Sequence, residues 1–224
     1  MPGYKCVFVG DKESKKTEMI ITYLKGEYPE KYVPSVFENQ DVYVELERKT
    51  FQLRLWDTGG QNDYDRLRPL SYPNTNVVLI CFSIVNQKSF ENVKNKWIPE
   101  IQHFCPKVPF ILVGTELDKR DDQETINELK EKGLSPITYQ QGLEMAKEFK
   151  AFNYIECSAR KQQNLKEVFQ EAVRASRNPK YYIQFKKKKE KEEKAKLKQK
   201  QKEEQKKKKE EQKKKKEKEK KKQN

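Results

Sequence analysis

The stretch YKCVFVGDKESKKT, residues 4–17, decides the fold of this chain. Its apolar run, Tyr4–Gly10, ends at a glycine, which is typical of a buried strand that stops at a turn. Helical spacing of apolar side chains follows over residues 16–25. A strand, a turn and a helix that begins at Lys16-Thr17 form the layout of a phosphate-binding loop, G-x-x-x-x-G-K-[ST]. Because Lys15 stands where that pattern has glycine, the segment taken alone also fits a lysine-rich surface turn.

The rest of the chain alternates between strand-like and helix-like segments. Residues 41–47 and 51–57 alternate apolar and polar side chains around a short polar stretch, which predicts a hairpin. Three further buried strands are predicted at 77–83, 110–114 and 153–157, and helices are predicted near 88–101, 140–150 and 164–176. This order predicts an α/β fold with a mostly parallel sheet and helices on both faces. Ligands of such sheets bind at the carboxyl ends of the strands.

The charge divides the 224 residues into two parts. The formal net charge is +14, but residues 186–224 hold 22 lysines and 9 glutamates, so the preceding part is nearly neutral. The tail has hardly an apolar side chain and cannot bury a core. We therefore predict one domain at residues 1–179 and a Lys/Glu-rich, flexible or partly helical tail at 180–224.

The remaining composition indicates a soluble, monomeric, cytoplasmic protein. Its N-terminus lacks the basic and apolar regions of a signal peptide, and its longest apolar run is far shorter than the ~20 residues of a membrane-spanning helix. Its four cysteines have no metal-ligand spacing, so we expect reduced, buried thiols.

Four motifs follow one another at or just beyond the ends of predicted strands. They are Lys16-Thr17, DTGGQ at 57–61, TELD at 115–118 and ECSA at 156–159. With YVPSVFEN at 32–39, YDRLRPLSYP at 64–73 and a charged insert at about 121–135, they make residues 3–178 resemble a Rho-family small GTPase, closest to the Rac-like branch. The resemblance implies a Ras-like P-loop fold with a six-stranded, mostly parallel sheet and a Rho-type insert helix.

The resemblance also implies the site. It assigns nucleotide binding to Gly10, Asp11, Lys12, Glu13, Ser14, Lys15, Lys16, Thr17, Glu18, Tyr28, Ser35, Asp57, Gly60, Gln61, Thr115, Leu117, Asp118, Ser158, Ala159 and Arg160. The cofactors would be GTP or GDP and Mg²⁺, which Thr17 and Ser35 would bind directly and Asp57 through water. Asp118 would read the guanine edge. Gln61 would be catalytic by orienting the attacking water.

Several residues depart from the family pattern. Large side chains stand at 12–15, where the loop must lie close to the phosphates. Glu116 replaces the lysine that normally lies against the base. The loss of that lysine's contacts would weaken nucleotide binding by a few kcal/mol, judged from roughly 1.5–3 kcal/mol for one charged hydrogen bond. We therefore expect a small GTPase with weakened nucleotide binding and slow turnover.

Partners of the switch regions would be effectors and exchange factors. The expected partner surface consists of Val36, Phe37, Glu38, Trp56, Tyr64, Leu67 and Leu70. Packing of Trp56 on the sheet face is a competing interpretation of that residue. The sequence ends without the cysteine that prenylation needs, so we expect no prenyl anchor.

Three functions remain open at this point. The first is a GTP-dependent signalling switch that acts on the actin cytoskeleton, as the resemblance implies. The second is a pseudo-GTPase, an interaction module or scaffold without turnover. The third is a polyanion binder, in which the tail holds RNA or the acidic inner surface of a membrane.

Overall fold

The computed structural model describes residues 3–31 and 38–177, and the side chain of Glu38 is not described. The chain divides into two units, residues 1–182 and 183–224. The predicted boundary at 179 and the tail lie outside the described residues, as do Ser35, Val36 and Phe37. In the described part, no helix has the length and apolar character needed to cross a membrane.

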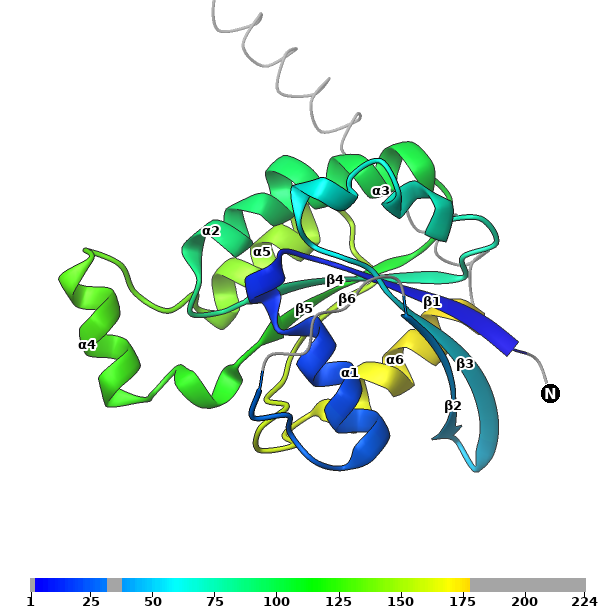
Figure 1. The fold of residues 1–224 in the computed structure, drawn as a ribbon, viewed down its shortest axis with the longest axis horizontal. Helices are drawn as coiled ribbons and strands as arrows, with labels where there is room; N and C mark the ends of the chain where they lie inside the picture. Colours follow the sequence, from blue (N-terminus) through cyan, green and yellow to red (C-terminus); the bar gives the residue numbers. More distant parts are fainter. Residues whose placement is uncertain (1–2, 32–37, 178–224) are drawn as a thin grey trace, which may run out of the picture. The chain divides into compact units, whose positions relative to one another are not determined.

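A six-stranded sheet with the order β2-β3-β1-β4-β5-β6 forms the centre of the domain (Figure 1). Its strands are β1 (Gly3–Val9), β2 (Glu38–Leu46), β3 (Lys49–Asp57), β4 (Val77–Ser83), β5 (Phe110–Thr115) and β6 (Asn153–Glu156). Only the β2–β3 pair is antiparallel; β1 pairs in parallel with β3 and β4, and β5 with β4 and β6. The predicted mostly parallel sheet and its hairpin are confirmed.

Helices cover both faces of the sheet. They are α1 (Lys16–Lys25), α2 (Gln87–Asn92), the π-helix η4 (Val93–Trp97), α3 (Ile98–Phe104), α4 (Gln123–Glu131), α5 (Tyr139–Glu148) and α6 (Leu165–Arg177), and short 3-10 turns lie at 12–14, 62–64, 68–71 and 117–119. Helices α1 and α6 pack on one face, and α2, η4, α3 and α5 on the other (Figure 1). This arrangement confirms the predicted helices on both faces.

The central strands are buried on both sides because their alternate side chains enter different cores. In β1, Cys6 and Phe8 join the α1–α6 side, whereas Val7 and Val9 join the opposite side. All seven side chains of β4 are buried. A parallel strand covered on both faces reads as a continuous apolar run, which is why residues 77–83 were recognisable in the sequence.

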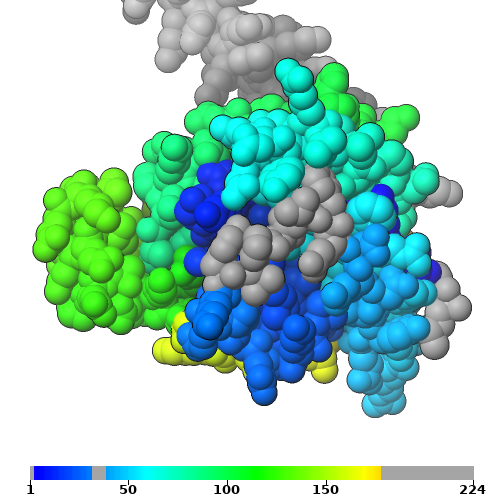
Figure 2. All heavy atoms as spheres, viewed as in Figure 1, coloured from blue at the N-terminus to red at the C-terminus, as the bar shows by residue number. Residues whose placement is uncertain are grey.

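Two helical predictions need comment. The charged insert at about 121–135 contains α4, whose Asp122 side chain accepts a hydrogen bond from the Thr125 N–H, and it forms a knob at the edge of the molecule (Figure 2). The helical stretch predicted near 88–101 is confirmed, and it consists of α2, the π-helical turn η4 at Val93–Trp97 and α3. Pro99 follows that turn and cannot donate a backbone N–H.

Candidate nucleotide site

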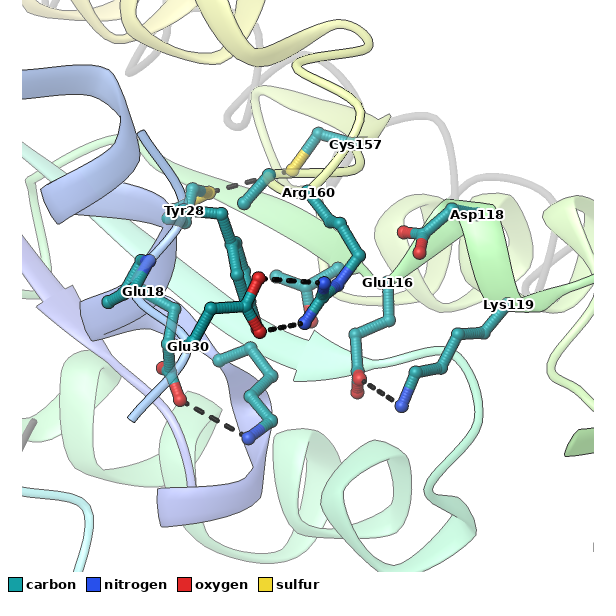
Figure 3. A pocket seen from close by; sticks show the side chains of 13 residues that line it. Glu18, Tyr28, Glu30, Glu116, Asp118, Lys119, Cys157 and Arg160 are labelled. Atoms are coloured by element: carbon teal, nitrogen blue, oxygen red, sulfur yellow. Dashed lines mark hydrogen bonds and ion pairs between the residues drawn. The ribbon is translucent and has the colours of Figure 1, made fainter. Parts of the chain in front are cut away.

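The four sequence motifs meet at one edge of the sheet. Strands β1, β3, β5 and β6 run in parallel, so the loops that follow them lie at the same edge. A cavity of about 220 Å³ opens between these loops (Figure 3). It is lined by Lys15, Glu18, Met19, Tyr28, Pro29, Glu30, Thr115, Glu116, Asp118, Lys119, Cys157, Ala159 and Arg160.

The loop after β1 has the shape of a phosphate-binding loop at its first residue. Gly10 has a φ of +148°, and a Cβ there would collide with the carbonyl oxygen of Cys81. Only glycine therefore fits at this turn. Ser14 is buried, and its hydroxyl has no hydrogen-bond partner within the described residues. Lys16, the first residue of α1, is also buried.

Lys15 adopts a conformation that glycine would favour. Its φ and ψ are 56° and 25°, in the left-handed region. Its ammonium contacts the Glu18 carboxylate at 3.2 Å, and only 5% of the Glu18 side chain is exposed. Burial lowers the pKa of Lys15, but the charges of Glu18 and Glu116 outweigh that effect and raise the pKa above its usual value. The extra lysine is thus neutralised inside the pocket by the protein itself.

The residues expected to bind Mg²⁺ are brought together as far as they are described. Thr17 Oγ1 donates a hydrogen bond to Asp57 Oδ2 at 2.6 Å. A hydroxyl and a carboxylate at the phosphate end of the site are the hard oxygen donors that Mg²⁺ prefers, so these two residues fit the ion. The third predicted ligand, Ser35, lies outside the described residues.

The loop after β3 lies directly against the phosphate-binding loop. A Cβ on Gly60 would clash with the Gly10 carbonyl oxygen and with the backbone at Asp11 and Lys12. Arg68, which is fully buried, donates hydrogen bonds to the Gly59 and Gln61 carbonyl oxygens at 3.2 and 3.4 Å. The predicted catalytic Gln61 therefore sits beside the phosphate-binding loop.

Arg68 is itself held by acidic groups and a ring. Its guanidinium pairs with Asp65 at 2.6 Å and Glu100 at 2.8 Å, and it lies 4.6 Å from the centre of the Trp97 ring. Tyr72 donates a short hydrogen bond to the same Glu100. A buried cation with this many partners fixes the path of the chain that follows Gln61.

The base end of the pocket is built around Asp118. Ser158 Oγ donates a hydrogen bond to Asp118 Oδ1 at 2.5 Å, and the Leu117 N–H bonds to the Cys157 carbonyl oxygen at 3.1 Å. Thr115 Oγ1 donates to the Ser14 carbonyl oxygen at 2.7 Å, which ties this loop to the phosphate-binding loop. Burial raises the pKa of the Cys157 thiol to about 12, so that lining residue stays protonated at neutral pH.

Glu116 makes contacts that a lysine could not make. Its carboxylate accepts a hydrogen bond from Ser83 Oγ at 2.6 Å and pairs with Lys119 at 2.9 Å. Like Lys15, it has a left-handed backbone, with φ 62°. The substituted acid is therefore satisfied within the pocket, where Figure 3 shows it pointing toward Lys119.

Arg160 and Tyr28 meet at the mouth of the pocket. The guanidinium lies 4.5 Å from the centre of the Tyr28 ring and forms two hydrogen bonds with Glu30, at 3.1 and 3.2 Å. Figure 3 shows Glu30 and Arg160 pointing toward each other. Both predicted residues thus lie at the mouth of the cavity, joined by a glutamate that the sequence did not reveal.

Other predicted residues are placed differently. The Asp11 carboxylate accepts hydrogen bonds from Asn92 Nδ2 at 2.6 Å and Trp97 Nε1 at 2.7 Å, so this side chain anchors the loop to α2 and η4. Ala159 lines the cavity, whereas Lys12 and Glu13 are exposed on the phosphate-binding loop.

The described part of the expected partner surface is partly exposed. Leu67 and Leu70 are 48% and 74% exposed, and Tyr64 is half-buried. Trp56 is half-buried under the Lys5 ammonium, which lies 3.8 Å from its ring centre, and it also packs against the core on the α3 side. The structure therefore supports the sheet-packing interpretation of Trp56, whose indole nitrogen is buried.

Sequence reasoning missed several residues that line the pocket. Lys119 could have been paired with Glu116 from its three-residue spacing in a helical turn. Glu30, Pro29 and Met19 carried no signal, because their role depends on where the loop after α1 returns to the sheet edge.

The chain was compared with models of protein families. The model of the Ras family matches residues 5–178, which include all four motifs and every described residue of the pocket.

Proposed function

The chain belongs to the Ras family of GTP-binding switch proteins, and we propose that it is a Rac-like, Rho-type member with weakened nucleotide binding and slow hydrolysis. The observation that carries the binding part is the Thr17–Asp57 hydrogen bond of 2.6 Å beside the buried Lys16. These groups hold the phosphates and Mg²⁺ in this family, and all of them are retained. The insert that contains α4 and the sequence at 64–73 support the Rho-type assignment.

The chemistry of the proposed enzyme step is hydrolysis of the terminal phosphate. Mg²⁺, when bound, would neutralise charge on the phosphate oxygens. Lys16 would add a second positive charge, and Gln61 would orient the attacking water. The Arg68 contacts with the Gln61 and Gly59 carbonyl oxygens hold this segment beside the phosphate-binding loop.

A pseudo-GTPase without turnover is the second candidate, and specific contacts favour it. Lys15 pairs with Glu18, and Glu116 pairs with Lys119, inside the cavity that the nucleotide would occupy. An anionic ligand must break these ion pairs or bind beside their carboxylates. We propose that weakened affinity, rather than loss of the site, is the result, because Asp118 and Ser158 keep their arrangement.

Cellular roles extend this proposal. We propose that the protein regulates the actin cytoskeleton through effectors and exchange factors, and that it is monomeric and cytoplasmic. The Lys/Glu tail would add attraction to the acidic inner membrane surface or to another polyanion. Salt-sensitive binding to acidic vesicles that is lost on deletion of 186–224 would support the role of the tail.

The purified full-length chain tests the proposed function directly. The protein is denatured, and the released nucleotide is identified by ion-exchange chromatography. Stoichiometric GDP would support a working switch, and GTP alone would support a module that does not hydrolyse it. An empty site in a folded protein, with no binding of added GDP, would contradict the proposal. An Asp118→Ala variant is the control for guanine-dependent retention.

A further inference from the structure

Two loops far apart in the sequence meet at the mouth of the nucleotide pocket. One follows α1 and contains Gly26, Tyr28 and Glu30, and the other follows β6 and contains Arg160 and Gln162. Both loops contribute to the lining of the cavity, through Tyr28, Pro29 and Glu30 on one side and Ala159 and Arg160 on the other.

Three hydrogen bonds and a ring contact join these loops, and we call this set the clasp. Glu30 accepts two hydrogen bonds from the Arg160 guanidinium, at 3.1 and 3.2 Å. Gln162 Nε2 donates to the Gly26 carbonyl oxygen at 2.7 Å. The guanidinium also lies over the Tyr28 ring (Figure 3). The bidentate geometry fixes both the distance and the orientation of the loops.

The clasp is built from groups that water can reach. The side chains of Arg160 and Glu30 are 51% and 73% exposed. Exposed ion pairs are weak and are screened by salt, with a screening length of about 8 Å at physiological ionic strength. This contact can therefore open and close without disturbing the core, unlike the Lys15–Glu18 pair, whose carboxylate is buried.

We infer that the Glu30–Arg160 clasp is a gate that sets how fast guanine nucleotide leaves the pocket. This inference rests on the proposed function. Opening the clasp frees the loop after α1, whose Tyr28 and Pro29 form one wall of the cavity. Closing it holds that wall against the loop that carries Ser158 and Ala159. Glu30 and Arg160 are thus positioning residues that act on nucleotide residence time.

The experiment measures release of a fluorescent GDP from the full-length protein at low and high salt. The variants are Glu30→Gln, Arg160→Gln and the charge swap Glu30→Arg with Arg160→Glu. Glu27→Gln is the matched control, because it removes an exposed carboxylate from the same loop. Hydrogen exchange of the amides at 26–31 gives a second readout that does not depend on release.

We expect each single variant to release GDP about fivefold faster at low salt, which corresponds to about 1 kcal/mol. The swap restores the pair and returns the rate to within about twofold of the wild type. High salt accelerates the wild type and leaves the single variants unchanged. Glu27→Gln behaves as the wild type.

Three results would overturn the gate. If the single variants speed amide exchange at 26–31 but not GDP release, the clasp orders the loop without gating the pocket, and the proposed function stands. If the swap releases GDP as fast as the single variants, the pair is not the cause. Failure of the wild type to load any GDP would overturn the proposed function and the gate together.

Discussion

The Lys15–Glu18 pair allows a prediction about the pocket that separates stability from binding. Replacing Lys15 with glycine removes a left-handed side-chain residue, a relief of roughly 1–2 kcal/mol. The same change leaves the Glu18 carboxylate, 5% exposed, without the ammonium at 3.2 Å. Removing one partner of a buried pair costs about 3–5 kcal/mol, and the 36% exposure of Lys15 places this case toward or below the lower end of that range.

Glycine also gives the unfolded chain more conformational entropy, which lowers the free energy of unfolding further, by about 0.4–1 kcal/mol. The net effect of Lys15→Gly alone is therefore a loss of about 1–2 kcal/mol in the free energy of unfolding. The double variant Lys15→Gly/Glu18→Ala removes the stranded carboxylate as well. We expect its stability to return to within about 1 kcal/mol of the wild type, and its affinity for GDP to rise at least tenfold, or ~1.4 kcal/mol.

Urea unfolding and GDP titration of the wild type and of the three variants Lys15→Gly, Glu18→Ala and the double variant complete a mutant cycle. Lys15→Met is the control, because it keeps the side-chain length and the left-handed strain but loses the charge. The reasoning is refuted if Lys15→Gly is as stable as the wild type. It is also refuted if the double variant binds GDP no better than the wild type, since the pair would then not obstruct the ligand.

Three further predictions concern other contacts. Arg68→Ala should destabilise the domain by about 3–5 kcal/mol, because Glu100 is left without its cation, and urea unfolding of Arg68→Ala beside Glu100→Gln would show whether the two losses overlap. Thr17→Ala should abolish the effect of Mg²⁺ on GDP release while Thr17→Ser keeps it, and equal Mg²⁺ dependence in both variants would contradict the role of the hydroxyl. Burial, followed by the charges of Asp118 and Glu156, raises the Cys157 pKa from 9.0 to about 12. The stability that the protonated thiol contributes should be fully present below pH 9, and the free energy of unfolding should fall by about 1.4 kcal/mol per pH unit above it, toward pH 12. Between pH 8 and pH 10, the free energy of unfolding should therefore fall less in Cys157→Ala than in the wild type.

The sheet was readable from the sequence because its strands are covered on both faces. The strand Val77–Ser83 was predicted with the bounds that the structure has. All seven of its side chains are buried, and all except that of Ser83 are apolar. The contact between Thr17 and Asp57 also agrees with the sequence pattern, because Asp57 ends β3 and Thr17 lies at the start of the helix that follows β1. Periodicity did not reveal the π-helical turn at Val93–Trp97, and the bonds to Asp11 from Asn92 before the turn and from Trp97 at its end span 81 and 86 residues.

The charge pairs of the pocket were not predictable for the same reason. Lys15 and Glu116 were recognised as departures, but the sequence did not show that Glu18 and Lys119 neutralise them. Arg160 and Glu30 are 130 residues apart, and only the return of both loops to one sheet edge brings them together. Local patterns therefore predicted that the four motifs meet at one edge of the sheet, whereas the charge pairs between their loops required the fold.

The indole of Trp97 gives this protein a built-in optical sensor. The ring is fully buried, and its N–H is bonded to Asp11 in the loop that would hold the phosphates, while the only other tryptophan, Trp56, lies on β3 opposite Val7 of β1. In a Trp56→Phe background, tryptophan emission would come from Trp97 alone. Arrival and departure of unlabelled nucleotide could then be followed in real time, without attaching a dye to either molecule.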